Sequence, residues 1–398
     1  MTKTTYGGAV EYAAAILLVV QILFARFYLR TRRDTWPRAV YGGVIALLVF
    51  FWFATAFSIW LTLTGVLYQR QVIPVKLGTT ISALGYFWVL LSSLAVAIGL
   101  PARWLITELS PPHSPARRSY LRAAGILAIG TPAVAAAFGM IVERSRFGVR
   151  ELDLPVSGLH PDLEGFRIVQ VSDLHVSPFL SLRDARRVIN MANDLKGDLA
   201  VFTGDLISEM GDPLDDAIRE LIRLRAGFGV LGCMGNHEMY IGCRDYLQYQ
   251  AQRAGLVFLR GAKTSIRRGE GVLNIAGVDY QPSAERSSYL RGAERLVMPG
   301  AANLLLSHNP DVFPTAVQRG FQAVLSGHTH GGQVNVEILH QNVNPARFRT
   351  PFTSGLYRQN VPGEAAASCF VTNGIGTIGM PIRLGAPPEI ALLRLVQA

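Results

Sequence analysis

The sequence predicts a multi-pass α-helical membrane domain over residues 1–149, followed by an α/β domain over residues 150–398. Two observations lead to this division. Half of the 398 residues are hydrophobic and the mean hydropathy is +0.27, which is more apolar than a soluble enzyme of this length usually is. The apolar excess lies before residue 143, whereas short β-branched runs alternate with helical patterns after residue 150, as in α/β domains.

Four apolar segments of the first domain are long enough to cross a bilayer as helices, which takes about 20 residues. They cover residues 12–29, 39–67, 79–100 and 122–142. The second segment contains no charged residue, which argues against a buried helix of a soluble core. The first segment is not followed by a small-residue cleavage site before Arg30, which argues against a cleaved signal peptide.

The positive charges between these segments predict an orientation, because cytoplasmic loops retain arginine and lysine. The first and third loops each hold four arginines, whereas the second loop holds only Arg70 and Lys76. We therefore expect the second domain on the periplasmic or extracellular side of the cell membrane, with the lipid bilayer as a partner. The arginines at positions 144, 146 and 150, directly after the last segment, count against this orientation.

The remaining composition excludes two classes of function. The net charge of +10 owes much to the loop arginines, and no basic stripe with interleaved aromatic residues is present, so no nucleic-acid partner is expected. Cys233, Cys243 and Cys369 are an odd number without a Cys-x-x-Cys pair, which favours buried thiols over a disulfide framework.

The second domain contains a series of predicted buried strands, with amphipathic helices at residues 183–195 and 213–225 between them. The strands are expected at residues 166–172, 199–203, 230–234, 273–278, 303–307, 323–326 and 367–372. Most of these strands are followed by a polar motif. Ligands gather at the carboxyl ends of strands in open α/β sheets, so motifs far apart in sequence should converge there.

These motifs contain carboxylates, an amide and imidazoles in a fixed order. They are Ser172-Asp173-Leu174-His175, Gly204-Asp205, Gly235-Asn236-His237-Glu238, Ser307-His308-Asn309 and Gly327-His328-Thr329-His330. Five of the eight histidines of the chain lie inside them. Oxygen and imidazole ligands suit divalent metals that act on phosphate, so the order predicts a two-metal hydrolase.

In these motifs the chain resembles the calcineurin-like metallophosphoesterase superfamily, from about residue 151 to residue 398. Four further motifs, Gly355-Leu356-Tyr357, Asn373-Gly374-Ile375-Gly376, Pro381-Ile382-Arg383 and Pro388-Glu389, resemble a membrane-associated bacterial branch of it. The resemblance implies a core of two sheets packed as a β-sandwich and flanked by helices, and it implies hydrolysis of phosphoric esters. It does not extend to the first domain.

The resemblance also implies a ligand set for two divalent metal ions. Asp173, His175 and His330 would bind one metal, Asn236, His308 and His328 would bind the second, and Asp205 would bridge both. A hydroxide between the metals would be the nucleophile. Mn²⁺ is the expected metal, and Fe, Zn or Co also suit these ligands.

Other residues receive more general roles. The resemblance makes His237 the non-ligand histidine that contacts the phosphate and protonates the leaving group, and Glu238 is expected to orient its neighbours. Arg383 is a candidate substrate-binding residue because a guanidinium suits phosphate, with a solvated surface arginine as the alternative. His160 and His340 are expected not to be ligands. Asp279 and Tyr280 follow a predicted strand and are candidates for the border of the cleft.

The favoured function is a membrane-anchored phosphoesterase acting on a phosphomonoester, a phosphodiester or a lipid-linked phosphate such as a phospholipid. A catalytically degenerate domain serving as a scaffold or sensor is the alternative, and the complete ligand set argues against it. A transporter with an appended hydrolase is a third reading, but the helices lack a row of inward ionisable residues. The sequence does not predict an oligomeric state.

Overall fold

The computed structural model describes residues 7–34, 37–64, 137–338, 341–361 and 363–398, with isolated positions between residues 81 and 135. The chain divides into two compact units, Met1–Ala137 and Phe138–Ala398. The second unit thus begins at Phe138 rather than at residue 150, because the chain just before the first strand already packs on the α/β core. Hydrogen bonds from Arg383 N to Gly139 O and from Gly385 N to Glu143 Oε1 make that contact.

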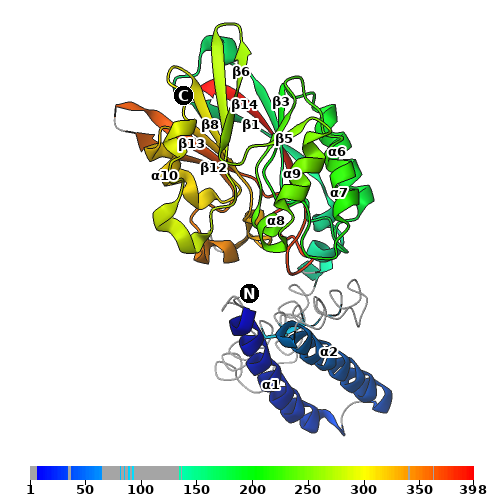
Figure 1. Cartoon of the computed structure of the whole chain (residues 1–398). Helices are drawn as coiled ribbons and strands as arrows, with labels where there is room; N and C mark the ends of the chain where they lie inside the picture. Colours follow the sequence, from blue (N-terminus) through cyan, green and yellow to red (C-terminus); the bar gives the residue numbers. More distant parts are fainter. Residues whose placement is uncertain are drawn as a thin grey trace, which may run out of the picture. The chain divides into compact units, whose positions relative to one another are not determined.

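The first unit contains helices α1 (Gly7–Arg32) and α2 (Arg38–Thr64) (Figure 1). In α2, the stretch Arg38–Trp60 is long and apolar enough to cross a membrane, whereas the apolar stretch of α1, Ala14–Phe27, is shorter. The expected segments 79–100 and 122–142 lie largely outside the described residues. The described residues therefore offer one candidate membrane span, and they do not support the multi-pass domain that the sequence predicts.

The buried polar residue of α1, Gln21, uses its amide nitrogen for two hydrogen bonds, whereas its Oε1 is buried without a partner among the described residues. The side-chain amide of Gln21 donates to Val89 O (3.1 Å) and to Ser93 Oγ (2.9 Å). Unpaired amide donors would be costly in an apolar environment, so these two bonds offset part of the cost of burying a glutamine in this helix.

The second unit is an α/β domain whose described residues form two six-stranded mixed sheets and one two-stranded sheet (Figure 1). The first sheet has the order β1 (Gly148–Val156), β14 (Glu389–Gln397), β2 (Arg167–Val171), β3 (Leu199–Phe202), β4 (Val230–Gly232) and β5 (Leu256–Phe258). Within it, β14 runs antiparallel to β2, and the other neighbours are parallel.

The second sheet has a run of parallel strands with an antiparallel strand at each edge. Its order is β12 (Gly355–Val361), β13 (Glu364–Val371), β9 (Ala323–Ser326), β8 (Ala302–Leu306), β7 (Gly271–Gly277) and β6 (Ala262–Arg268). The small sheet pairs β10 (Val336–Ile338) with β11 (Gln341–Val343). All seven strands predicted in the second domain coincide with observed strands, shifted or shortened by a few residues at their ends.

The two large sheets face each other across an apolar core, because successive side chains of a strand point to opposite faces. In β2, Ile168 joins the cluster between the sheets, whereas Val169 joins the cluster beneath the helices. The first sheet is covered on its outer face by α6 (Leu182–Asp194), α7 (Leu214–Leu221) and α9 (Arg244–Gln252), and the second by α10 (Phe313–Gln318) (Figure 1). This confirms the predicted α/β class with two sheets flanked by helices.

Candidate metal centre

The polar motifs follow parallel strands of both sheets and meet at the carboxyl ends of these strands. Asp173 follows β2, Asp205 follows β3, His308 follows β8 and His328 follows β9. The short helix α8 (Asn236–Ile241) follows β4 and contributes the amide motif. Strand direction therefore brings together side chains that are up to about 160 residues apart in sequence.

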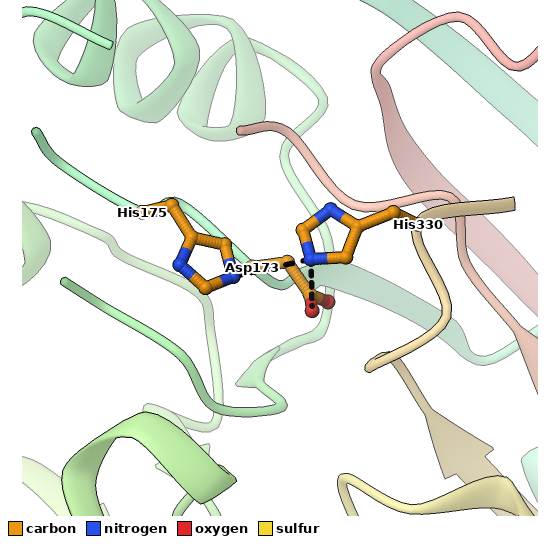
Figure 2. Close-up of side chains that lie close together, drawn as sticks. All are labelled: Asp173, His175 and His330. Atoms are coloured by element: carbon orange, nitrogen blue, oxygen red, sulfur yellow. Dashed lines mark hydrogen bonds and ion pairs between the residues drawn. The ribbon is translucent and has the colours of Figure 1, made fainter. Parts of the chain in front are cut away.

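One group of potential ligands consists of Asp173, His175 and His330, each of which offers an atom within 4.8 Å of the others (Figure 2). His175 Nε2 lies 3.1 Å from His330 Nε2, and the latter lies 3.4 Å from Asp173 Oδ1. All three side chains are buried. Two imidazole nitrogens that face one another beside a carboxylate suit a shared cation.

A second group consists of Asp205, His308 and His328, again with one atom each within 4.8 Å of the others. His308 Nε2 lies 3.0 Å from Asp205 Oδ2, and His175 Nε2 of the first group lies 3.5 Å from the same oxygen. One oxygen of Asp205 is thus adjacent to both groups. This is the position that a bridging ligand requires.

Buried polar atoms without partners test whether the site suits a metal. Among the described residues, Asn236 Oδ1 and His308 Nε2 are buried and make no hydrogen bond. The contact between His308 Nε2 and Asp205 Oδ2 is an ion pair only when the ring is protonated. Other buried atoms of the described residues, such as Gln170 Oε1 and Asn274 Oδ1, also lack partners, but these two belong to expected ligands of the second metal, and a cation would satisfy them, so the residues present fit a metal centre.

The backbone at most of the candidate ligands adopts the left-handed conformation, with a positive φ, that non-glycine residues rarely adopt. Eight non-glycine residues of the described chain have a positive φ, and five of these are candidate ligands. They are Asp173 (53°), His175 (47°), Asp205 (59°), His328 (75°) and His330 (53°). Such conformations cost about 1–3 kcal/mol each and cluster at functional sites, where the surrounding structure imposes them.

Glu238 holds two of the turns that carry these ligands. Its carboxylate accepts hydrogen bonds from the backbone N–H groups of Asp205 (3.0 Å), Leu206 (2.7 Å) and Gly235 (2.7 Å). Gly235 must be glycine, because an added Cβ would lie 2.1 Å from Asp205 Oδ1. The orienting role expected of Glu238 therefore agrees with its contacts.

His237 forms a third group of potential ligands with His175 and Asp205, again with one atom each within 4.8 Å of the others, but one of its ring nitrogens already makes a hydrogen bond. Its Nδ1–H donates to Ser208 O, and its backbone N–H donates to Asp205 Oδ1 (2.9 Å). Its ring is edge-on to that of His175, with centroids 4.8 Å apart. Because Nδ1 is occupied, Nε2 is the nitrogen available to a ligand. Burial lowers the pKa of His237, although the charge of Asp205 opposes that shift.

The electrostatics of the pocket favour a cation. Burial lowers the pKa of His328 to about 3 and the pKa of His330 well below its usual value, so both rings are neutral, as metal ligands must be. Burial also raises the pKa of Asp173. Burial acts to raise the pKa of Asp205 too, but the neighbouring histidines, His308 first, hold it well below its usual range. Burial acts to lower the pKa of His308, but the charges of Asp205 and Asp173 raise it to about 10, so in the absence of a metal this ring supplies the positive charge that the buried carboxylates require.

Three expectations at the margin of the site have different outcomes. His160 is partly exposed, and its Nδ1 accepts from Asp162 N (3.2 Å) at the start of the short helix η2 (Pro161–Leu163), so it caps a turn and is not in the centre. His340 lies outside the described residues. The alternative considered for Arg383, a solvated surface arginine, is wrong, because its side chain is fully buried, and its contact with a substrate stays a prediction.

Two tyrosines border the centre. The hydroxyl of Tyr280 lies 3.5 Å from His328 Nε2, whereas the adjacent Asp279 turns away to Arg244 and Arg260. The sequence motifs do not point to Tyr240, whose ring is 6.1 Å from that of His237 and 6.3 Å from that of Tyr280. Its position three residues after His237 on α8 is the signal that could have identified it, because residues at that spacing share a helix face.

Comparison with known proteins assigns the family. Residues 166–332 match the family model for calcineurin-like phosphoesterases. The metallophosphoesterase YkuE of Bacillus subtilis is 30% identical over 293 residues, which cover 70% of this chain and 97% of YkuE. The transmembrane protein with metallophosphoesterase domain of Danio rerio is 28% identical over 284 residues, covering 69% of this chain and 63% of that protein. The chain belongs to the calcineurin-like metallophosphoesterase family, and it is a metal-dependent hydrolase of phosphoric esters.

Proposed function

We propose that this protein is a membrane-anchored phosphoesterase with two divalent metal ions in one centre. Asp173, His175 and His330 would hold the first ion, Asn236, His308 and His328 the second, and Asp205 would bridge them. The observation that carries the proposal is the position of Asp205 Oδ2, 3.5 Å from His175 Nε2 and 3.0 Å from His308 Nε2. Two like charges held about 3.5–4 Å apart need a shared anionic ligand, and Asp205 offers one.

When bound, the ions would supply Lewis-acid activation of water and neutralise the charge on the phosphoryl group. The chain's own contribution is positional. Glu238 fixes the backbone of Asp205, and Ser208 O fixes the ring of His237 with Nε2 free for the leaving-group oxygen. Tyr280, whose hydroxyl lies near His328, would donate a hydrogen bond to a phosphoryl oxygen bound there.

The substrate class we propose is a phosphomonoester, a phosphodiester or a lipid-linked phosphate. The apolar helix α2 and the name of the Danio rerio relative support attachment to a bilayer, which raises the local concentration of lipid phosphates. Purified protein in detergent, assayed with each metal against monoester, diester, nucleotide and lipid-phosphate substrates, tests this class. Turnover confined to water-soluble nucleotides would remove the lipid assignment.

Hydrolysis of an aryl phosphodiester is expected to stop when the metals are chelated and to return best with Mn²⁺. The reason is the ligand set of carboxylate, amide and imidazole groups, which suits Mn²⁺ and also accepts Fe, Co or Zn. Elemental analysis of the purified protein is the direct measurement. Less than one equivalent of any divalent ion, under conditions in which a known two-metal enzyme loads fully, would contradict the two-metal centre.

The proposed orientation predicts where the catalytic unit lies. Alkaline phosphatase fused after Ala398 is expected to be active, and a fluorescent protein that matures only in the cytoplasm is expected to be dark, because each arginine in the first and third loops resists translocation. The reverse pattern would place the catalytic unit among cytosolic substrates and, if the first and third loops are cytoplasmic, would imply an odd number of spans.

A further inference from the structure

Arg383 is a buried cation with an unusual set of partners. Its guanidinium donates to three backbone carbonyls: Nε to Gly376 O (3.1 Å), and Nη1 to Ala386 O (3.0 Å) and His330 O (3.3 Å). The third guanidinium nitrogen, Nη2, also donates to Gly376 O, which therefore accepts two hydrogen bonds from Arg383. Burying a guanidinium is costly unless its donors are bonded, so these contacts are a built feature of the fold.

The carbonyl of Gly376 also lies next to the ring of His330, at 3.3 Å from Nδ1. The other ring nitrogen, Nε2, faces His175 and Asp173 (Figure 2). A histidine that binds a metal through Nε2 carries its proton on Nδ1 and needs an acceptor for it. Gly376 O is that acceptor, and in this tautomer the 3.3 Å approach of Arg383 Nη2 to Nδ1 is a packing contact between two donors.

Arg383 therefore fixes His330 from two sides. It binds the backbone carbonyl of His330 directly, and it clamps the carbonyl that receives the ring proton. Because the φ of His330 is positive (53°), the backbone has no intrinsic preference for this turn and depends on such contacts. Losing the guanidinium would free both the turn and the ring orientation.

The loop that carries Arg383 is held in turn by the chain preceding β1. Arg383 N–H donates to Gly139 O (3.2 Å), and Gly385 N–H donates to the buried carboxylate of Glu143 (2.9 Å). The approach is close: a Cβ on Gly139 would lie 2.5 Å from Arg383 O. Neither Gly139 nor Glu143 nor Arg383 falls within residues 166–332, which match the family model.

We propose that Arg383 is a positioning residue for His330, and that Gly139 and Glu143 complete this support, so that the first metal site depends on the segment preceding the α/β sheets. The inference rests on the proposed role of His330 as a metal ligand. It assigns that segment a role beyond linking the two units. A soluble fragment that starts at residue 150 would lack Gly139 and Glu143, and is expected to bind the first metal weakly.

The test compares Mn²⁺ binding by the full chain in detergent, measured by equilibrium dialysis, with thermal unfolding of the metal-free protein. Arg383→Met is expected to weaken binding of one of two Mn²⁺ equivalents by about 10- to 100-fold, the usual effect of losing a group that orients a ligand. Arg383→Lys, which keeps the charge and one donor, should recover part of that affinity. Arg394→Met is the matched control, because Arg394 pairs with Asp153 on the exposed surface.

Two glycine substitutions test whether the segment preceding β1 supports the loop that carries Arg383. Gly139→Ala is expected to weaken the same Mn²⁺ equivalent, whereas Gly148→Ala should not, because its added Cβ would meet nothing closer than 3.8 Å. Wild-type affinity for both equivalents in Arg383→Met overturns the inference. Equal weakening of both equivalents together with a lower unfolding temperature also overturns it, since that is general destabilisation. A wild-type protein that binds fewer than two equivalents contradicts the proposed function instead.

Discussion

Asp205→Asn is expected to abolish hydrolysis and to empty at least one of the two metal sites. The substitution keeps the shape of the side chain and removes its charge. Oδ2 of Asp205 lies beside His175 and His308, so it is the carboxylate oxygen placed to offset the repulsion between two cations. Without that charge the second cation would meet only neutral ligands and the first cation.

The measurement is elemental analysis of the purified variant alongside its rate on an aryl phosphodiester. Asp198→Asn is a suitable control, because Asp198 lies just before β3, at the opposite end of the strand from Asp205, and accepts a hydrogen bond from Arg167 N (2.7 Å). Two full equivalents of metal with substantial turnover in Asp205→Asn would show that the bridging role belongs to another group.

The location of the centre was predictable from the sequence because it depends on strand direction. Asp173, Asp205 and His308 each follow a short apolar run, and parallel runs must end at one edge of a sheet. The strands that were not predicted are mainly edge strands and hairpins with charged or short apolar patterns. In β1, Arg150, Glu151 and Asp153 interrupt the apolar pattern, so pairing with β14 from the far end of the chain is what makes it a strand.

The role of Arg383 could not be predicted from the sequence. Its burial is compensated by backbone carbonyls of residues 330, 376 and 386, and a carbonyl has no signature in a sequence. The positive φ of the ligand residues could not be predicted from the sequence either. The residue types of Asp173 and His175 do not predict a left-handed backbone conformation, which the surrounding tertiary contacts impose.

For the first unit, the sequence predicts more membrane spans than the described residues support. Apolar length alone predicts four spans, whereas one described helix, α2, meets the criteria for a span. Hydropathy measures how a segment partitions, and it does not depend on the tertiary contacts that a fold requires. The reporter fusions proposed above test the number of spans more directly than any feature of the catalytic unit.

His237→Ala is expected to retain both metals and to lower turnover of an alkyl phosphate ester by about 10²- to 10⁴-fold, the usual contribution of a general acid. The metals should remain because His237 supports Asp205 through its backbone N–H, which alanine keeps. Burial lowers the pKa of the ring, so the imidazole is neutral until an anionic phosphate binds beside it and favours the protonated form. Nε2 would then deliver the proton to the departing oxygen.

The decisive comparison uses a nitrophenyl ester, whose leaving group is stable without a proton. If His237 is the general acid, His237→Ala should slow that substrate far less than it slows the alkyl ester. His160→Ala serves as the histidine control, because His160 caps a turn and lies outside both ligand groups. Equal losses on the two substrates would contradict proton transfer. In that case the ring beside His175 would serve to bind the phosphoryl group, and protonation of the leaving group would fall to water.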